Sequence, residues 1–414
     1  MMSLVVRVLS VLLVALLLSG CDAAGPQSQP DTAAPPTIEL TAAQQDVLDG
    51  TGTTFGLDLF GTLNEEKGAD QNVIVSPFSV STALTMALNG ARDSTRRALK
   101  QALGVSDHSM REINEAHRRL AEALPGLDTT ATLRSANSLW AQNGYPVKAA
   151  FTDTLRSVFG AEARRIDFAS PEAPDRINGW VADQTEGMIQ TLVKDKDLDG
   201  NTVLALLNAL YFEAPWQTAF DEEQTEDASF ARPGRPAVGV PMMHRTDSLR
   251  YGSTDRAKMV DLPYGNGAFR MTVVVPEEET TAHALATDLD AATWARWLDG
   301  LETRRVQVRL PRFDVTVPRA NLNEVLRTMG LGIIFLPWAN FSGLSPRNPS
   351  VKKALHKAAI VVDEDGTEAS AATAVIFGES TPPTVRADRP FLFAIREAQT
   401  GTLLFLGRIA DPTA

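Results

Sequence analysis

The hydrophobic and polar positions of this chain repeat with two different periods, and the period changes along the sequence. Apolar residues recur at helical spacing from Ser76 to Leu103, with a break near Asn89-Gly90. A spacing of three to four residues is typical of a helix that buries one face. Ser76, followed by a proline, predicts an N-cap and a first helical position. The same spacing recurs at residues 110–123, 150–158, 174–192 and 285–298.

Strand patterns take over in the second half of the chain. Thr202–Phe212 is apolar almost throughout, which is typical of a strand covered on both faces. Val306–Leu310 alternates between apolar and polar residues, as a half-exposed strand does. Residues 359–362 and 391–395 have the composition of buried strands. Helices dominate the first half of the chain and strands the second half, an order that favours the α+β class over a regular βαβ repeat.

Residues 363–383 separate these last two strands and have an unusual pattern. Long connections without secondary structure are uncommon in compact domains, and they are usually functional. From Thr367 to Phe377 the segment alternates: one face carries only small or apolar residues, and the other carries the single charge, Glu368. A strand needs an uncharged face to pack into a core. The pattern predicts a segment that can be either an exposed loop or an inserted strand.

The first twenty residues form a separate region. Arg7 is their only charge, an apolar run extends from Val11 to Leu18, and the segment ends at Ser19-Gly20-Cys21. This resembles a bacterial lipoprotein signal peptide, which is cleaved before a cysteine that is then acylated. An ordinary signal peptide with an incidental cysteine is the alternative. Because Cys21 is the only cysteine, we expect lipidation there, no internal disulfide, and an exported protein anchored to a lipid bilayer, facing the periplasm or the cell exterior.

Residues 21–43 are rich in Pro, Ala, Ser and Thr, a composition that predicts a flexible tether. We expect residues 44–414 to form a single domain. With 51 acidic and 39 basic residues, the formal net charge is −12. That balance argues against nucleic acid, or an anionic membrane surface, as a partner.

The motifs of common enzymes are absent from the sequence. It contains no GxSxG, HExxH, GxxxxGK or CxxC, and its five histidines are not at metal-ligand spacing. We therefore expect no catalytic residue, no metal and no cofactor. A Ser-His-Asp triad assembled in three dimensions is the enzymatic alternative, because triads are recognised by geometry and not by spacing.

Several segments instead match one family, in the order in which that family carries them. These segments are Asn72-Val-Ile-Val-Ser-Pro-Phe-Ser79, Asn208-Ala-Leu-Tyr-Phe212 with Trp216 and Phe220, Val240-Pro-Met-Met243, Leu310-Pro-Arg-Phe313, Asn340-Phe-Ser-Gly343, His356-Lys-Ala358, Val362-Asp-Glu-Asp-Gly-Thr-Glu-Ala369, Arg389-Pro-Phe-Leu-Phe393 and Leu404-Phe-Leu-Gly-Arg408. Together they resemble the serpins over about residues 50–412. The resemblance implies an α+β fold with helices mostly in the N-terminal half, three β-sheets including a large central one, and an exposed reactive-centre loop at about residues 363–384.

The sequence departs from the family pattern in two places. Glu213-Ala-Pro215 stands where the family usually has a Lys-Gly pair before the tryptophan. Residues 332–338 are unusually apolar for the approach to the Phe341-Ser342-Gly343 turn. Neither departure falls in the predicted loop.

The resemblance also implies a function. A serpin-type inhibitor is attacked by a serine endopeptidase, and in some cases a cysteine endopeptidase. The cleaved loop then inserts into the central sheet and traps the acyl-enzyme. The alternative is a non-inhibitory member acting as a chaperone, carrier or surface-binding protein. In either case we expect a monomer and no enzymatic activity.

The hinge of the loop is where insertion begins. The resemblance assigns it to Glu364, Gly366, Thr367, Glu368, Ala369, Ser370, Ala371 and Ala372. Gly366 can adopt backbone angles that other residues avoid, and Thr367 is small and β-branched, which suits a strand. The alanine and serine residues offer neither bulk nor charge to slow insertion. Non-inhibitory members typically carry charged or bulky residues here.

The position of the scissile bond depends on how the loop is aligned. Matching Ser380-Thr-Pro-Pro383 to the family's downstream pattern places cleavage between Glu379 and Ser380. Counting a standard loop length from Glu364 gives Ser380–Thr381 instead. Glu379 implies a glutamate-selective protease, and Ser380 implies an elastase-like or subtilisin-like one. A register shifted to Phe377 implies a chymotrypsin-like protease.

A last group of residues matches the positions beneath the central sheet that control its opening, which we call the shutter. The group consists of Ser76, Ser79, Asn208 and His356. A single hydrogen-bonded buried histidine is the alternative for His356. In both cases a buried polar group requires a hydrogen-bond partner.

Overall fold

The computed structural model describes residues 34–187, 189–198, 200–316, 320–357, 359–366 and 382–414. Helices lie mostly in the N-terminal half and strands in the C-terminal half, which confirms the α+β class. The helices are α1 (Ala42–Leu48), α2 (Phe55–Lys67), α3 (Pro77–Gly90), α4 (Asp93–Ala102), α5 (Met110–Ala123), α6 (Ala149–Phe159), α7 (Ala173–Gln184), α8 (Ala282–Asp288), α9 (Ala291–Asp299) and α10 (Asn323–Leu326).

Two predicted helices are shorter than the periodicity indicated. Helix α7 ends at Gln184 and does not reach residue 192, because Glu186 and Gly187 take positive φ angles of 50° and 84°. The predicted helix 285–298 is two helices, since the side chain of Asp290 caps α9 by accepting a hydrogen bond from the Thr293 N–H. The cap at Ser76 is confirmed: its side chain accepts a hydrogen bond from the Ser79 N–H.

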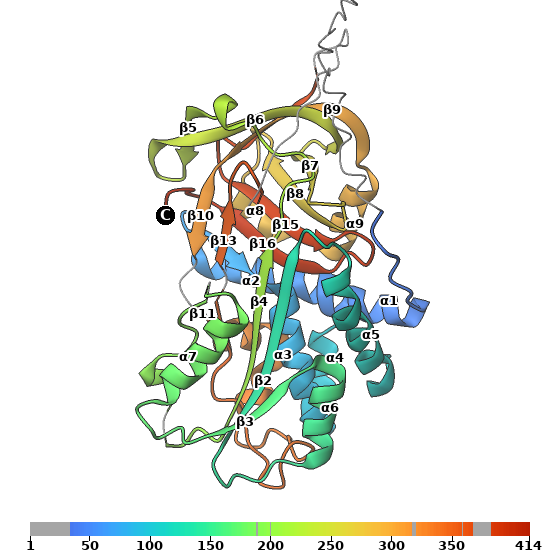
Figure 1. Cartoon of the computed structure of the whole chain (residues 1–414), viewed down its shortest axis with the longest axis vertical. Helices are drawn as coiled ribbons and strands as arrows, with labels where there is room; N and C mark the ends of the chain where they lie inside the picture. The colour runs from blue at the N-terminus through green and yellow to red at the C-terminus, as the bar shows by residue number, and fades with distance from the viewer. Residues whose placement is uncertain (1–33, 188, 199, 317–319, 358, 367–381) are drawn as a thin grey trace, which may run out of the picture. The chain divides into compact units, whose positions relative to one another are not determined.

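The largest sheet contains nine of the strands in the described residues, in the order β1-β16-β15-β8-β7-β6-β9-β14, with β5 paired to β6. Their bounds are β1 (Val73–Val75), β5 (Glu226–Arg232), β6 (Arg235–Ser253), β7 (Ala257–Pro263), β8 (Phe269–Pro276), β9 (Glu302–Pro311), β14 (Thr384–Arg386), β15 (Phe391–Glu397) and β16 (Leu403–Ile409). Figure 1 shows β5, β6 and β9 at one end of this sheet. The pairing of β14 with β9 is parallel, and it places the residues after the predicted loop beside Gln307.

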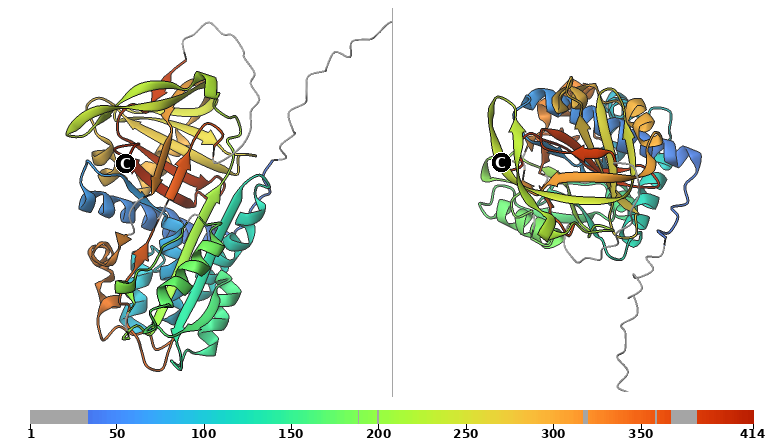
Figure 2. Two further views of the ribbon diagram at one scale, coloured as in Figure 1. Left: turned by 60° about the vertical axis from the view of Figure 1, so that its left-hand side comes forward. Right: turned by 90° about the horizontal axis from the view of Figure 1, so that it is seen from above.

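The remaining strands form a three-stranded sheet and two short pairs. The three-stranded sheet has the order β3-β2-β4, with β3 (Glu162–Ile166), β2 (Thr132–Gln142) and β4 (Leu204–Glu213). The pairs are β10 (Phe313–Thr316) with β13 (Ala359–Val362), and β11 (Ala320–Asn321) with β12 (Leu355–His356). In Figure 2, β2, β3 and β4 run side by side below the large sheet.

Helices cover both faces of the three-stranded sheet. Leu210 and Phe212 belong to the same buried cluster as residues of α3, whereas Leu207 and Ala209 pack with α7. The rings of Trp140 on β2 and Trp180 on α7 meet edge to face at 6.2 Å. The apolar run of β4 is therefore covered on both faces, as predicted. Several β4 residues remain only half-buried, however, and β4 pairs only with β2 in the described ranges.

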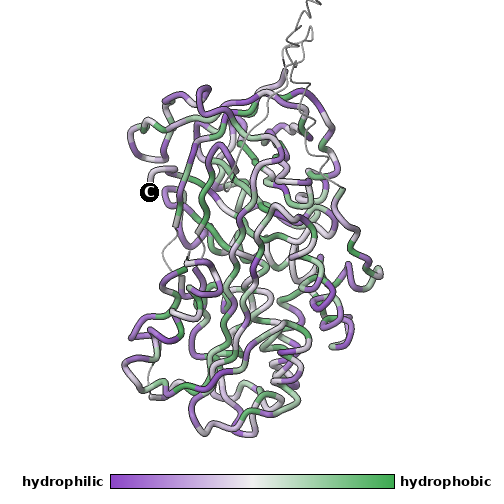
Figure 3. Tube along the Cα trace, in the orientation of Figure 1, coloured by the Kyte–Doolittle hydropathy of each residue, from purple (hydrophilic) through white to green (hydrophobic). Residues whose placement is uncertain are grey.

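The hydrophobic core extends from α2 and α3 through the inner strands of the large sheet. Every residue of β15 and β16 is buried, and Figure 3 shows hydrophobic segments through the interior with hydrophilic ones along the outer turns. Residues Pro36 and Ile38, which lie within the predicted tether, are hydrogen-bonded to the side chain of Gln399. In the part of the chain with assigned structure, no helix is long and apolar enough to cross a membrane.

Candidate functional site at the opening beside β4

The strand edge of β4 faces β12 without any strand pairing in the described part of the chain. A cavity of about 170 Å³ lies here, lined by Leu204–Asn208 on one side and Lys352–His356 on the other. Residues of α3, among them Ser79 and Val80, also line it. An unpaired strand edge exposes backbone donors and acceptors that an added strand can satisfy. The geometry therefore suits the acceptance of one more strand.

The N-terminus of α3 is hydrogen-bonded to both sides of this opening. The Ser76 N–H donates to Nε2 of His356 on β12 at 3.1 Å. The Ser79 hydroxyl donates to the Asn208 carbonyl on β4 at 3.5 Å, a longer and weaker contact. The structure thus brings together all four residues predicted for the shutter, although they come from three separate parts of the chain. Their role in controlling the opening stays a prediction.

The shutter residues are mostly buried, and burial sets the protonation state of His356. Burial lowers the pKa of His356 to about 4, so its imidazole is neutral at pH 7 and its Nε2 can accept the Ser76 hydrogen bond. The Asn208 amide donates to Oδ1 of Asn137 at 2.6 Å and to the Ser135 hydroxyl at 3.2 Å, which ties β4 to β2. The Asn208 Oδ1 has no hydrogen-bond partner among the described residues.

The hinge begins at an ion pair whose carboxylate is buried. Glu364 is 2% exposed, and its carboxylate accepts hydrogen bonds from Arg312 at 2.6 Å and from the Thr225 hydroxyl at 2.5 Å. Burial raises the pKa of Glu364, but the hydrogen bonds from Arg312 and Thr225 outweigh burial and hold that pKa below its usual value. The carboxylate is therefore ionised at neutral pH and fixes the end of β13 to its neighbours.

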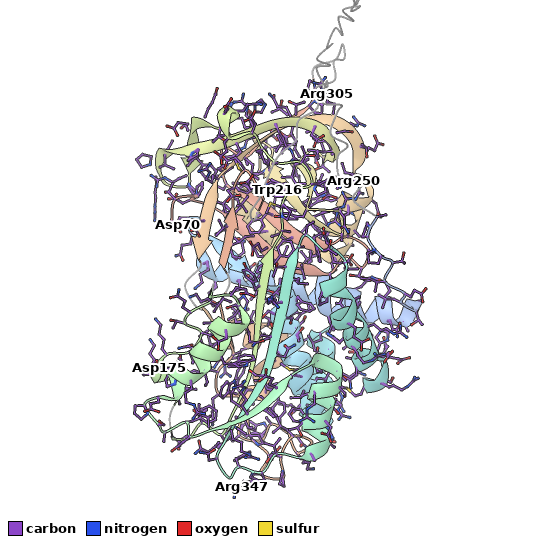
Figure 4. The ribbon with its side chains drawn as sticks, in the orientation of Figure 1. Asp70, Asp175, Trp216, Arg250, Arg305 and Arg347 are labelled. Atoms are coloured by element: carbon purple, nitrogen blue, oxygen red, sulfur yellow. The ribbon has the colours of Figure 1, made fainter. Side chains whose placement is uncertain are left out.

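The next residues are held against Trp216. Its indole N–H donates to the Asp363 carbonyl at 2.9 Å, and its backbone N–H donates to the Asp365 carbonyl at 2.9 Å. The indole stacks on Tyr264 with ring centroids 4.3 Å apart. Figure 4 labels Trp216 in the upper half of the view. Gly366 has φ of 115°, and a Cβ added there would come within 2.4 Å of the Trp216 nitrogen. Only glycine fits this position without displacing the backbone.

The rest of the predicted site lies outside the described residues. It comprises Cys21, Thr367, Glu368, Ala369, Ser370, Ala371, Ala372, Glu379, Ser380 and Thr381. The chain is described again from Pro382, and the Pro383 carbonyl accepts a hydrogen bond from the Gln307 N–H at 2.9 Å. The two ends of the predicted loop are thus both fixed, one at β13 and the other on β9.

Three residues of the site were missed from sequence: Arg312, Thr225 and Asn137. Arg312 could have been predicted, because it is the basic residue of the Leu310-Pro-Arg-Phe313 segment that matches the family. Thr225 and Asn137 carry no such signal, because their partners are 139 and 71 residues away in the chain.

Comparison with known proteins agrees with this architecture. A family model described as serpin (serine protease inhibitor) matches residues 51–412. The chain therefore belongs to the serpin family. Iripin-2 from Ixodes ricinus is 34% identical over 383 residues, covering 90% of this chain and 96% of the relative. Leukocyte elastase inhibitor from Sus scrofa is 34% identical over 379 residues, covering 88% and 99% respectively.

Solved structures of two further family members have the same fold. Human thyroxine-binding globulin in complex with thyroxine has a TM-score of 0.82 and 28% identity, covering 90% of this chain and 100% of that one. Native protease nexin-1 with heparin has a TM-score of 0.81 and 29% identity, covering 89% and 100%. The similar proteins thus include one named as an elastase inhibitor and one named as a thyroxine-binding globulin.

Proposed function

We propose that this serpin is a suicide-substrate inhibitor of a serine endopeptidase. The observation that carries the proposal is the unpaired edge of β4 beside a cavity, together with a hinge whose first residues are anchored at Glu364 and Gly366. The sequence that follows Gly366 alternates and has no charge on one face. A strand of that pattern can enter the opening without burying an ion.

The mechanism follows from these parts. The protease attacks the loop at Glu379–Ser380 or at Ser380–Thr381 and forms an acyl-enzyme. Residues from Thr367 onward then insert beside β4, and the protease travels with the cleaved loop. About a dozen new inter-strand hydrogen bonds at about 0.5–1.5 kcal/mol each make insertion favourable by roughly 10 kcal/mol. The uncleaved protein is held away from that lower state by a kinetic barrier.

A denaturing gel and a melting experiment together test the proposal. The protein is incubated with glutamate-selective, elastase-like and subtilisin-like proteases. The expected result is a covalent complex that survives denaturation, with mass spectrometry locating the cleaved bond. Loop cleavage by a non-target protease is expected to raise the thermal unfolding midpoint. A nicked protein that melts no higher than the intact one contradicts strand insertion, and it favours a non-inhibitory carrier or chaperone.

We further propose that Cys21 is acylated and that, of the predicted tether 21–43, the residues before the Pro36 contact with Gln399 link the domain to a membrane. The support is the apolar leader and the single cysteine of the sequence. The Cys21→Ala variant is expected to move from the membrane fraction to the soluble fraction. If the variant stays in the membrane fraction with an unprocessed leader, an uncleaved signal anchor replaces the lipid anchor.

A further inference from the structure

One face of the large sheet, beside the exit of the predicted loop, carries basic residues without acidic ones. Strands β6, β9 and β14 are neighbours there, and their register places His244 opposite Arg309, Thr246 opposite Gln307, and Ser248 opposite Arg305. Thr384 and Arg386 of β14 continue the same rows beside Gln307 and Arg309. We call these residues, His244, Thr246, Ser248, Arg305, Gln307, Arg309, Thr384 and Arg386, the β9 face.

Contacts confirm that these side chains share one side of the sheet. The Gln307 amide lies 2.8 Å from Nε2 of His244, and its carbonyl oxygen accepts a hydrogen bond from the Thr384 hydroxyl at 3.0 Å. The alternate residues, among them Val306 and Val308, are buried on the other side. The β9 face is therefore the outer, solvent-facing side of these strands.

The β9 face is basic, although the chain as a whole is acidic. The protein has a net charge of −12, yet none of the residues of this face is acidic. Arg305 is exposed and Arg309 half-buried, and neither forms an ion pair with another described residue. Arg386 pairs with Asp388 at 2.8 Å beyond the end of β14. Arginines without a carboxylate partner are available to an external anion.

The β9 face is also close to where a protease must bind. Thr384 lies four residues after Ser380, so even a fully extended chain separates the predicted scissile bond from it by only about 13–18 Å. A protease domain of some 250 residues has a radius of gyration of about 18 Å. A protease bound at that bond therefore extends over neighbouring surfaces, and the β9 face is the one joined to the loop's exit by the Gln307–Pro383 hydrogen bond.

We propose that the β9 face is a docking surface for an acidic rim beside the active site of the target protease. This inference rests on the proposed function and adds a partner chemistry to it: selection by charge as well as by the residues at the scissile bond. Complementary charge of this kind accelerates encounter and selects partners, with effects on association rates of 10-fold or more.

A protein surface fits the β9 face better than a linear polyanion does. Carboxylates stand at its margins: Glu226 lies near His244, and Asp388 pairs with Arg386 at 2.8 Å. A long anionic polymer has to pass over these carboxylates and over a protein of net negative charge. A compact acidic patch on a folded partner does not.

The test compares two proteases on matched variants. The probes are two subtilisin-type proteases that both cleave the loop, one with an acidic and one with a basic rim around its active site. The charge-reversal variant is Arg305→Glu with Arg309→Glu. The matched control is Arg176→Glu with Arg347→Glu, which changes the net charge equally. Both control arginines are exposed, and Figure 4 shows Arg347 at the opposite end from Arg305. The readout is the second-order rate constant of loop cleavage at low and at high salt.

At low salt we expect charge reversal to slow cleavage by the acidic protease roughly 10-fold or more and to accelerate cleavage by the basic one. At 0.5 M salt, where the Debye length falls to about 4 Å, the differences should largely disappear. The Arg305→Lys/Arg309→Lys variant keeps the charge and should retain the wild-type rates. Unchanged thermal unfolding midpoints show that the variants fold.

Several outcomes overturn the docking surface. Equal rates for the variant and the wild type do so, as does a slowing that the control variant reproduces. A loss of binding to dextran sulfate with unaltered cleavage rates assigns the β9 face to a polyanion instead. A protease that cuts the loop without being trapped contradicts the proposed inhibition. The docking proposal can still be tested in that case, because its readout is the rate of loop cleavage and not complex formation.

Discussion

The guanidinium of Arg312 lies 2.6 Å from the buried carboxylate of Glu364, at the end of the strand from which the predicted loop departs. The Arg312 side chain is 46% exposed and that of Glu364 only 2%. The pair is therefore asymmetric. Loss of the arginine leaves a buried anion with one hydrogen-bonding partner, Thr225, whereas the arginine itself can be hydrated.

The first prediction is that Arg312→Met weakens the hinge. A buried carboxylate that loses a charged hydrogen-bond partner destabilises its surroundings by about 2–3 kcal/mol. We expect a lower thermal unfolding midpoint and faster self-association on mild heating. The control is Arg304→Met, because Arg304 forms a pair of the same chemistry with Glu302 but both are exposed, and such pairs contribute about 0–1 kcal/mol. Equal effects of the two substitutions contradict the importance of the Arg312–Glu364 pair.

The second prediction concerns pH and His356. Burial lowers its pKa to about 4, whereas the unfolded value is about 6.5. On acidification, His356 is protonated at a higher pH in the unfolded chain than in the folded one. Its contribution to the free energy of unfolding is therefore fully present above about pH 6.5 and is lost as the pH falls toward 4. At pH 5 the loss is roughly 2 kcal/mol for this one residue. We expect the unfolding rate of the wild type to rise between pH 7 and pH 5.

The His356→Asn variant tests this assignment through the slope and not the absolute rate. Its unfolding should depend less steeply on pH, even if it is less stable at pH 7. His117 is a second buried histidine whose pKa is lowered to about 4, and it serves as the comparison. Each single variant should remove part of the slope, and the double variant more. A slope unchanged in His356→Asn shows that other groups carry the acid sensitivity.

The sequence allowed some of this site to be predicted and not the rest, for identifiable reasons. Ser76 and His356 were predicted as one cluster because each belongs to a family segment, and the 3.1 Å hydrogen bond places them together. Local signals also gave the α3 cap. The partnership of Glu364 with Thr225 was not predictable, since nothing local marks a threonine 139 residues away. The unpaired edge of β4 was also hidden, because an apolar run looks the same whether one or two neighbours are paired with it.

The third prediction is that Gly366→Ala disrupts the hinge contact with Trp216. At φ of 115° a Cβ would come within 2.4 Å of the Trp216 nitrogen and 2.7 Å of the Ala214 carbonyl oxygen. Backbone strain alone costs about 1–3 kcal/mol, and the clash adds to it. We expect a lower unfolding midpoint and faster proteolysis near Asp365. Gly144→Ala is the matched control, because its φ is 75° but no atom lies within 4 Å of the added Cβ. If both substitutions have the same effect, strain and not the Trp216 contact is responsible.

The fourth prediction is that Arg245→Met stabilises the protein. Arg245 is 6% exposed, and none of its side-chain nitrogens has a hydrogen-bond partner among the described residues, although its guanidinium lies 3.7 Å from the Asp247 carboxylate. Its guanidinium lies 4.8 Å from the Phe220 ring, and burial lowers its pKa to about 10. Methionine retains the packing and removes the desolvated charge, and the Asp247 carboxylate, which is 30% exposed, stays in contact with water. We therefore expect the substitution to be neutral or stabilising by about 1–4 kcal/mol. We expect a higher unfolding midpoint, with exposed Arg305→Met as an indifferent control. A large fall in the midpoint for Arg245→Met indicates that the ion pair with Asp247 outweighs the desolvation of the guanidinium.

The fifth prediction addresses strand insertion directly through Thr367 and Glu368. In the alternating pattern Thr367 belongs to the uncharged face, which must enter the core, whereas Glu368 belongs to the other. Thr367→Arg therefore places an unpaired charge in the core at a cost of several kcal/mol. Insertion slows, and we expect the variant to be cleaved as a substrate with little covalent complex. Glu368→Arg introduces the same side chain one residue away. This variant should still form the complex, because position 368 is expected to face solvent in the inserted strand.

The ratio of complex to cleaved product on a denaturing gel measures both variants at once. Cleavage rates should stay close to the wild-type value, because neither substitution touches the predicted scissile bond. Positions 367 and 368 are neighbours in the sequence and lie on opposite faces only if the segment forms a strand. A difference between the two variants is therefore specific to strand insertion. Full yield of complex from Thr367→Arg, or equal losses from both variants, excludes insertion of this segment in the predicted register.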